Sequence, residues 1–105
     1  MENARTELLE ILVNKPKVKC AKITKGEKWD EYDIVDEYIL KIGYTPKDYE
    51  NFLNKLDFNY DSGYGGQNLF GILWFDDGTW LDRGEYDGSE WWQYQKSPDI
   101  TDDLI

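Results

Sequence analysis

Carboxylates and aromatic rings are interleaved in the C-terminal third of the chain. The site candidates are Asp76, Asp77, Trp80, Asp82, Glu85, Asp87, Glu90 and Trp92. Aromatic residues rimmed by carboxylates are typical of a binding hot spot for a basic protein, whose lysine or arginine cations can contact the ring faces. This interpretation predicts mostly exposed carboxylates, and at least one of Trp80 and Trp92 as an exposed anchor. The competing interpretation is that the rings serve only sheet packing and cross-strand pairs.

A catalytic site has little support in the residue types. The chain has no histidine and one cysteine, Cys20, so a nucleophile activated by histidine cannot be built. Cys20 lies in a strand pattern, where we expect a small buried hydrophobic side chain. Asp82 with Glu85 could provide the carboxylate pair of a glycosidase, but so could many pairs among 22 acidic residues. We therefore predict that the protein is not an enzyme.

Motifs for metals and phosphates are incomplete. Residues 57–62 begin like a calcium loop, but Ser62 stands where that loop needs glycine and Asn68 where it needs glutamate. The glycines in 63–66 lack the lysine and hydroxyl residue of a P-loop, and we interpret them as a hairpin turn that needs positive φ. A zinc site would need several cysteine or histidine ligands. The sequence therefore predicts no metal and no cofactor.

Two helices are expected to support the sheet that carries these residues. The apolar residues of 6–13 predict a short helix docked on a sheet and ended by Asn14 and Pro16. The second helix starts at Thr45-Pro46, because threonine offers an N-cap oxygen and proline has its φ preset for the first helical position. Its apolar stripe is Tyr49, Phe52, Leu53 and Leu56.

Alternating apolar residues, and at 69–75 a run that is apolar on both faces, predict the strands. We expect them at 17–24, 37–43, 58–60, 69–75, 79–86 and 90–96. The alternation slips near Ala21, which indicates a bulge or a strand covered on both faces. Residues 25–36 are expected to form a long hairpin connection, with a helix as the alternative. Tight turns are predicted at 76–78 and at Asp87-Gly88.

The central strand at 69–75 is apolar on both faces. We expect its Phe70 and Ile72 to share one core with the apolar stripe of the second helix. Together these elements predict an α+β fold, with an antiparallel sheet of about five to six strands ending in a β-meander and two helices on one face. The length fits a single domain, 1–105, in which 97–105 form a loose tail.

Net charge restricts the partners. The chain carries −10 at neutral pH, and acidic residues dominate 29–105. Direct nucleic-acid binding is disfavoured, because phosphate contacts need a basic patch. The start lacks a signal peptide's basic and apolar regions, and the apolar runs are too short for a membrane span. These features predict a cytoplasmic protein without membrane contact that binds a basic protein surface, and they are compatible with a homodimer.

A stretch of the C-terminal half is similar to known small proteins. Its most specific piece is DGTWLDRGEYDGSEWW, residues 77–92, within a longer similar stretch, 58–94. This stretch resembles the C-terminal half of small proteins scattered through phage and mobile-element genomes. The resemblance implies a genomic context without an assigned activity, and small acidic phage proteins often inhibit host machinery.

These observations favour one role among three. The leading hypothesis is a phage or mobile-element accessory protein that inhibits a host defence or nucleic-acid-handling protein through an acidic aromatic face. The alternatives are a small-ligand-binding domain with an aromatic pocket near residues 63–66, and a self-assembling interaction protein. A flat surface lined by carboxylates would favour the first, a deep aromatic pocket the second, and a large self-complementary apolar surface the third.

Overall fold

The computed structural model describes residues 1–26, 36–60, 67–98 and 100–104. The expected α+β fold is confirmed, with two helices and a five-stranded antiparallel sheet in the order β3-β2-β5-β6-β7. The helices are α1 (Ala4–Leu12) and α2 (Pro46–Lys55). The strands of the sheet are β2 (Val18–Lys25), β3 (Asp36–Leu40), β5 (Leu69–Phe75), β6 (Trp80–Tyr86) and β7 (Ser89–Gln95).

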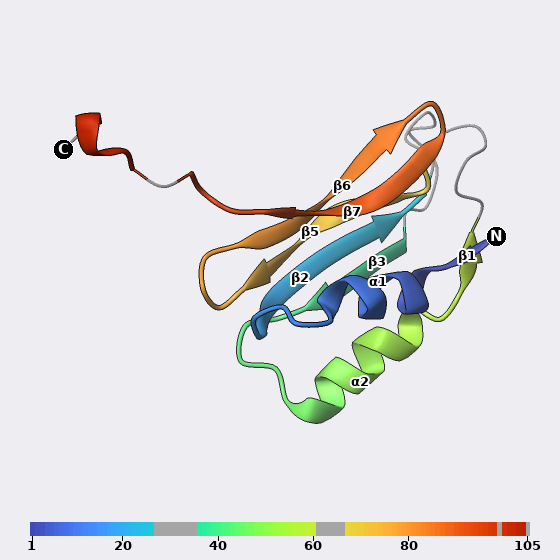
Figure 1. The fold of residues 1–105 in the computed structure, drawn as a ribbon. Coiled ribbons are helices and arrows are strands. Elements are labelled where there is room, and N and C mark those ends of the chain that lie inside the picture. The colour runs from blue at the N-terminus through green and yellow to red at the C-terminus, as the bar shows by residue number, and fades with distance from the viewer. Residues whose placement is uncertain (27–35, 61–66, 99, 105) are drawn as a thin grey trace.

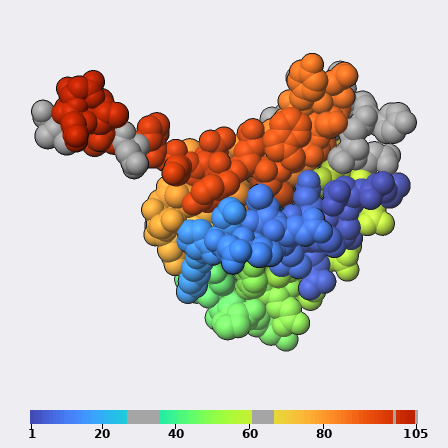
Figure 2. Space-filling view, in the orientation of Figure 1, coloured from blue at the N-terminus to red at the C-terminus, as the bar shows by residue number. Residues whose placement is uncertain are grey.

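The molecule has two layers (Figures 1 and 2), because both helices lie on the same side of the sheet. A second, two-stranded sheet pairs β1 (Glu2–Asn3) with β4 (Asn59–Tyr60) beside the start of α1. Beyond β7 the chain projects away from the sheet and ends in a short 3₁₀ turn, η1 (Asp102–Leu104), whose residues are exposed. In the described part of the chain, no helix combines the length and apolar character that crossing a membrane requires.

Capping residues determine where both helices begin. The Thr45 hydroxyl accepts from the backbone N–H of Asp48, and the Asp48 carboxylate accepts from the backbone N–H of Thr45, which completes a capping box with Pro46 at the first helical position. This start is where the sequence predicts it. The first helix begins two residues before its expected start, because Asn3 caps it by accepting from the N–H of Thr6 at 3.0 Å.

Strand β2 contains the irregularity that the sequence indicates near Ala21. Its pairing with β5 shifts register between Val18 and Cys20, so Val18 and Ala21 both face the helices. Strand β3 ends at Leu40, earlier than expected. The expected hairpin connection lies largely at residues 27–35 and the glycine turn at 61–66, both outside the described residues.

Two tight turns connect the last three strands, as predicted. The β6–β7 turn has Asp87 at φ 51° and Gly88 at φ 85°, left-handed values that the Asp-Gly pair tolerates. In the β5–β6 turn Gly78 takes φ 87°, and the Asp77 carboxylate accepts from both the backbone N–H and the hydroxyl of Thr79. These turns fix the register in which β6 pairs with its two neighbours.

The core lies between the sheet and the helices. Phe52, Leu53 and Leu56 of the second helix are buried there, as the apolar stripe predicts. The expectation for β5 was wrong, since Leu73 and Phe75 enter this core while Phe70 and Ile72 point to the opposite face. A strand that is apolar on both faces does not reveal from sequence which face the helices cover.

Candidate functional site

The face of the sheet opposite the helices carries several partly exposed aromatic side chains. Residues directly opposite each other in an antiparallel sheet share a face. One row across the sheet is Cys20, Trp74, Trp80 and Gln95, and the next is Ile39, Lys22, Ile72, Asp82 and Gln93. Phe70 and Trp91 extend this surface toward the other end of the strands. We call the surface made by these residues the uncovered face.

Large apolar side chains remain accessible on the uncovered face. Trp74 and Trp91 are each 40% exposed and Ile39 is 50% exposed, while Trp80 and Phe70 are half-buried. Cys20 is half-buried here, which differs from the buried position expected for it. A shallow hollow of about 270 Å³ lies over β2 and β5, between Lys22 and Trp74. Contiguous exposed apolar side chains of this kind mark interaction surfaces.

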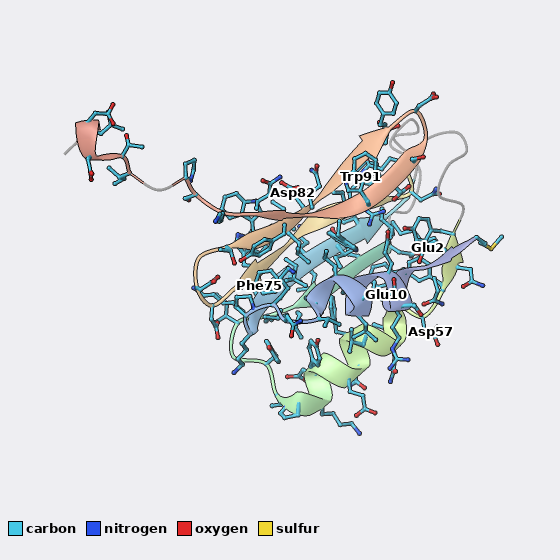
Figure 3. All side chains as sticks on the ribbon, in the orientation of Figure 1. Glu2, Glu10, Asp57, Phe75, Asp82 and Trp91 are labelled. Carbon is cyan, nitrogen blue, oxygen red and sulfur yellow. The ribbon has the colours of Figure 1, made fainter. Side chains whose placement is uncertain are left out.

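Asp82 provides a carboxylate in the middle of the uncovered face. It accepts hydrogen bonds from the side-chain amides of Gln93 at 2.9 Å and Gln95 at 3.4 Å, both on the neighbouring strand. Figure 3 shows Asp82 and Trp91 on the side of the sheet away from Glu10 of α1. The cross-strand pair of Trp80 with Trp74 lies one row away from Asp82. Two of the predicted site residues, Trp80 and Asp82, therefore belong to this surface.

Four other predicted carboxylates lie at the two ends of the sheet. Asp76 and Asp77 occupy the β5–β6 turn, while Glu85 and Asp87 lie at the β6–β7 turn, and all four are exposed as expected. The hydrogen bonds from Thr79 lower the pKa of Asp77, because they favour its charged form. The predicted acidic residues therefore form two separate rims rather than one continuous face.

Glu90 and Trp92 differ from their expected positions. Glu90 is only 5% exposed and Trp92 only 7%, so neither belongs to an exposed surface. Both face the helix side, because they alternate with Trp91 along β7. The uncovered face therefore contains Trp91 in place of Trp92, and of the two predicted tryptophans only Trp80 lies on it, where it is half-buried rather than exposed.

A buried polar cluster centred on Arg83 explains why Glu90 points inward. Nη2 of Arg83 lies 2.5 Å from Oε1 of Glu90 and also donates to the Tyr60 hydroxyl at 3.2 Å. Nη1 donates to Oε1 of Glu7 at 3.1 Å, and that carboxylate also accepts from the Tyr60 hydroxyl at 2.6 Å. The guanidinium lies 4.8 Å from the centre of the Trp92 ring, a cation–π distance. We call Glu7, Tyr60, Arg83 and Glu90 the buried cluster.

Glu90 also holds the segment that leads into β5. Its carboxylate accepts from the backbone N–H of Asn68 at 2.6 Å and from that of Leu69 at 2.9 Å. Nε of Arg83 and Nε1 of Trp92 are buried and have no hydrogen-bond partner among the described residues. The Arg83 guanidinium therefore connects α1, β4, β6 and β7, and Glu90 extends this connection to Leu69 of β5.

The electrostatics of the buried cluster reflect its burial. Burial raises the pKa of Glu7, although hydrogen bonds from Tyr60 and Arg83 partly oppose that rise. Burial and the Glu7 carboxylate raise the pKa of Tyr60 well above its ordinary value. Burial would lower the pKa of Arg83, but the charge of Glu7 and the contacts with Tyr60 and Glu90 leave it raised. The shifts of Tyr60 and Arg83 preserve a neutral tyrosine and a cationic arginine, whereas the shift of the pKa of Glu7 favours its protonated form.

The buried cluster was not found from the sequence. One sequence feature could have indicated it. Arg83 is the only arginine or lysine between residues 56 and 95, and it lies two residues after Leu81, so strand alternation directs both side chains to the same, core-facing side. Its partners Glu7 and Tyr60 lie 76 and 23 residues away along the chain. Their side chains turn inward and pair with one another, so the arrangement acts to position structural elements.

Other parts of the described chain give weaker candidates for a binding or metal site. A hollow of about 520 Å³ lies between the end of β3 and α2, lined by Ile42, Tyr44 and Phe52 among others. The position expected for an aromatic small-ligand pocket, near residues 63–66, lies outside the described residues. Within residues 1–26, 36–60, 67–98 and 100–104, no group of three or more acidic or cysteine side chains is placed to hold a metal ion.

Comparison of the chain with protein-family models, curated proteins and solved structures gives no match. The geometry of the uncovered face and the charge around it are therefore the grounds for assigning a function.

Proposed function

We propose that the chain is a non-catalytic binding protein that docks a basic host protein on its uncovered face. The observation that supports the proposal most is the row of accessible apolar side chains on a sheet face that has helices only on its other side. Trp74, Trp91 and Ile72 provide large contact areas with few rotatable bonds, which is the character of an interface anchor.

The chemistry of the partner follows from the charges around this face. Asp76 and Asp77 lie at one end of the strands, Asp87 lies at the other, and Asp82 lies between them, while Lys22 in the same row as Asp82 pairs with Glu37. A partner surface with an apolar centre and lysine or arginine at its rim complements this arrangement. A second copy of the chain fits poorly, because each copy carries a net charge of −10.

The genomic context that the resemblance implies suggests which proteins could present such a surface. Residues 77–92 resemble small phage and mobile-element proteins, so the partner would be a factor of the host cell, encountered in its cytoplasm. Host defence and nucleic-acid-handling proteins have basic surfaces for phosphate groups. An acidic protein that covers such a surface would act as an inhibitor without binding nucleic acid itself.

The test compares what matched baits retain from host lysate. The face variant combines Ile72→Ser with Trp74→Ser, and the control variant carries Ile42→Ser, because Ile42 is 69% exposed between β3 and α2. We expect a basic protein to be retained by the wild type and the control and lost from the face variant. Identical retained proteins from wild type and face variant would contradict the proposal.

Salt provides the second arm of this experiment. The carboxylates at the ends of the strands are exposed, and added salt screens such charges beyond about 8–10 Å. We expect association of the retained protein to slow with added salt and with Asp76→Asn combined with Asp87→Asn, while its dissociation changes little. Association that ignores both changes would show that the acidic rims do not attract the partner.

A further inference from the structure

The two edges of the five-stranded sheet differ in how they are protected. Strand β3 is five residues long, carries the exposed Asp36 and Glu37, and packs against α2. Strand β7 is seven residues long and contains no lysine, arginine, proline or glycine. Its single charged residue, Glu90, points inward to Arg83. Edge strands in natural proteins are usually short, charged, bulged or covered.

An unprotected edge presents backbone groups to a further strand. Among the described strands, β7 pairs with β6 alone, so in an antiparallel ladder alternate residues direct their N–H and C=O away from the sheet. Residues 91–95 read WWQYQ, which combines high β propensity with no charge. These are the properties of an edge that accepts an added strand.

A groove beside β7 indicates which side chains the added strand would carry. It has a volume of about 300 Å³ and is lined by Glu7, Glu10 and Ile11 of α1 together with Trp91 and Trp92 of β7. Glu10 is exposed, and Glu7 is partly engaged by Arg83. Successive side chains of an added strand point to opposite faces, so every second one would enter this groove and meet the carboxylates.

The charge of the groove also distinguishes between two possible occupants of this edge, a second copy of the chain and a segment of another protein. A second copy paired β7 to β7 about a two-fold axis would bring the Glu7 and Glu10 carboxylates of both copies to the same side of the joined sheet. Its β7 contains no lysine or arginine to meet them; Lys96 follows the strand, and Lys15 of the same copy lies over Tyr94, with its Nζ 5.0 Å from the ring centre. An extended segment with lysine or arginine at alternate positions meets the groove with opposite charge.

We propose that β7 accepts an extended, basic segment of another protein as a sixth strand, with its alternate cations directed into the groove beside α1. This surface is the edge of the sheet rather than the uncovered face, so the inference can fail while the proposed function holds, and the reverse.

The test uses the ¹⁵N-labelled full chain and a short peptide in which lysine and valine alternate. We expect the amide signals of β7 to shift and their hydrogen exchange to slow, while those of β3 do not change. The same peptide with N-methylated backbone amides keeps its charges but cannot donate the ladder hydrogen bonds, so it should not bind. A peptide with glutamate in place of lysine should not bind either.

Two charge variants locate the contact. Glu10→Lys should weaken peptide binding by roughly tenfold, because an attractive charge in the groove becomes repulsive. Glu50→Lys makes the same change at an exposed position of α2 and should leave binding unchanged. The face variant, Ile72→Ser with Trp74→Ser, should bind the peptide like the wild type, which separates this result from the proposed function.

Three results would overturn the inference. The first is absence of binding, and the second is equal binding of the N-methylated peptide, which would indicate charge attraction without strand pairing. The third is a dimer in sedimentation whose β7 amides are already protected from exchange, which would make a second copy the occupant of this edge.

Discussion

The two faces of the five-stranded sheet are built from the same kinds of residue and yet have different roles. Trp91 and Trp92 are neighbours on β7, but Trp92 is buried under α1 beside Arg83, while Trp91 remains 40% exposed on the uncovered face. Leu73 and Ile72 differ in the same way on β5. Strand alternation divides the apolar residues of this chain between a core and a surface.

The largest expected effect separates these neighbouring tryptophans. Trp92→Ala should reduce the free energy of unfolding by about 3–5 kcal/mol, because it opens a cavity in the core and removes the ring beside Arg83. Trp91→Ala should cost about 1 kcal/mol or less, since its ring is partly in solvent. Urea denaturation of both variants measures the difference, and equal losses would show that the two faces are not energetically distinct.

The buried cluster is a feature of the helix side only, and breaking it gives the next largest effect. Arg83→Met keeps much of the side-chain volume but leaves Glu90 buried without its cation, and we expect a loss of about 3 kcal/mol. Adding Glu90→Gln to this variant should recover part of the loss, because the uncompensated charge is then removed. If Arg83→Met alone is as stable as the wild type in urea denaturation, this result would contradict the role given to Arg83.

Several of these features could be predicted from the sequence because their causes are local. Thr45, Pro46 and Asp48 begin α2 through contacts within one turn, and Asp87-Gly88 forms its hairpin through its own backbone preferences. The apolar run at 69–75 and the alternation along 79–86 predicted these strands for the same reason. Local residue chemistry therefore gave the elements and the fold class.

The side of the sheet that each residue faces required long-range information. Phe70 and Leu69 are both apolar, and Leu69 is buried because it packs with Ala4 of α1 and with Tyr60 of β4. The sequence alone predicts an exposed Glu90. In the structure it is buried because β6 places Arg83 beside it, and Arg83 also pairs with Glu7 of α1. The acidic residues were expected on one surface, although the predicted turns at 76–78 and 87–88 flank the strand at 79–86 and therefore lie at opposite ends of β6.

A smaller effect concerns the pH dependence of the helix side. Burial raises the pKa of Glu7 above 4.5 in the folded protein, so the fold favours its protonated form. The stability that protonation contributes is complete below pH 4.5 and is lost as the pH rises through the raised pKa. Relative to Glu7→Gln, the free energy of unfolding of the wild type should therefore fall across this window.

Paired urea titrations at several pH values test this sign. Subtracting the Glu7→Gln values removes the contributions of the other carboxylates, which the two proteins share. A wild-type advantage that grows as the pH rises above 4.5 would mean that the ion pair with Arg83 outweighs burial at this carboxylate.

The uncovered face should contribute contacts to a partner rather than stability to the fold, and crosslinking tests this claim most directly. Benzoylphenylalanine replaces Trp74 in one protein and the exposed Ile42 in another, and each is irradiated in host lysate. We predict a crosslink to a basic protein from position 74, none to that protein from position 42, and loss of the crosslink at high salt. A crosslink of equal yield from both positions, or from position 42 only, would contradict the assignment of the uncovered face as the binding surface.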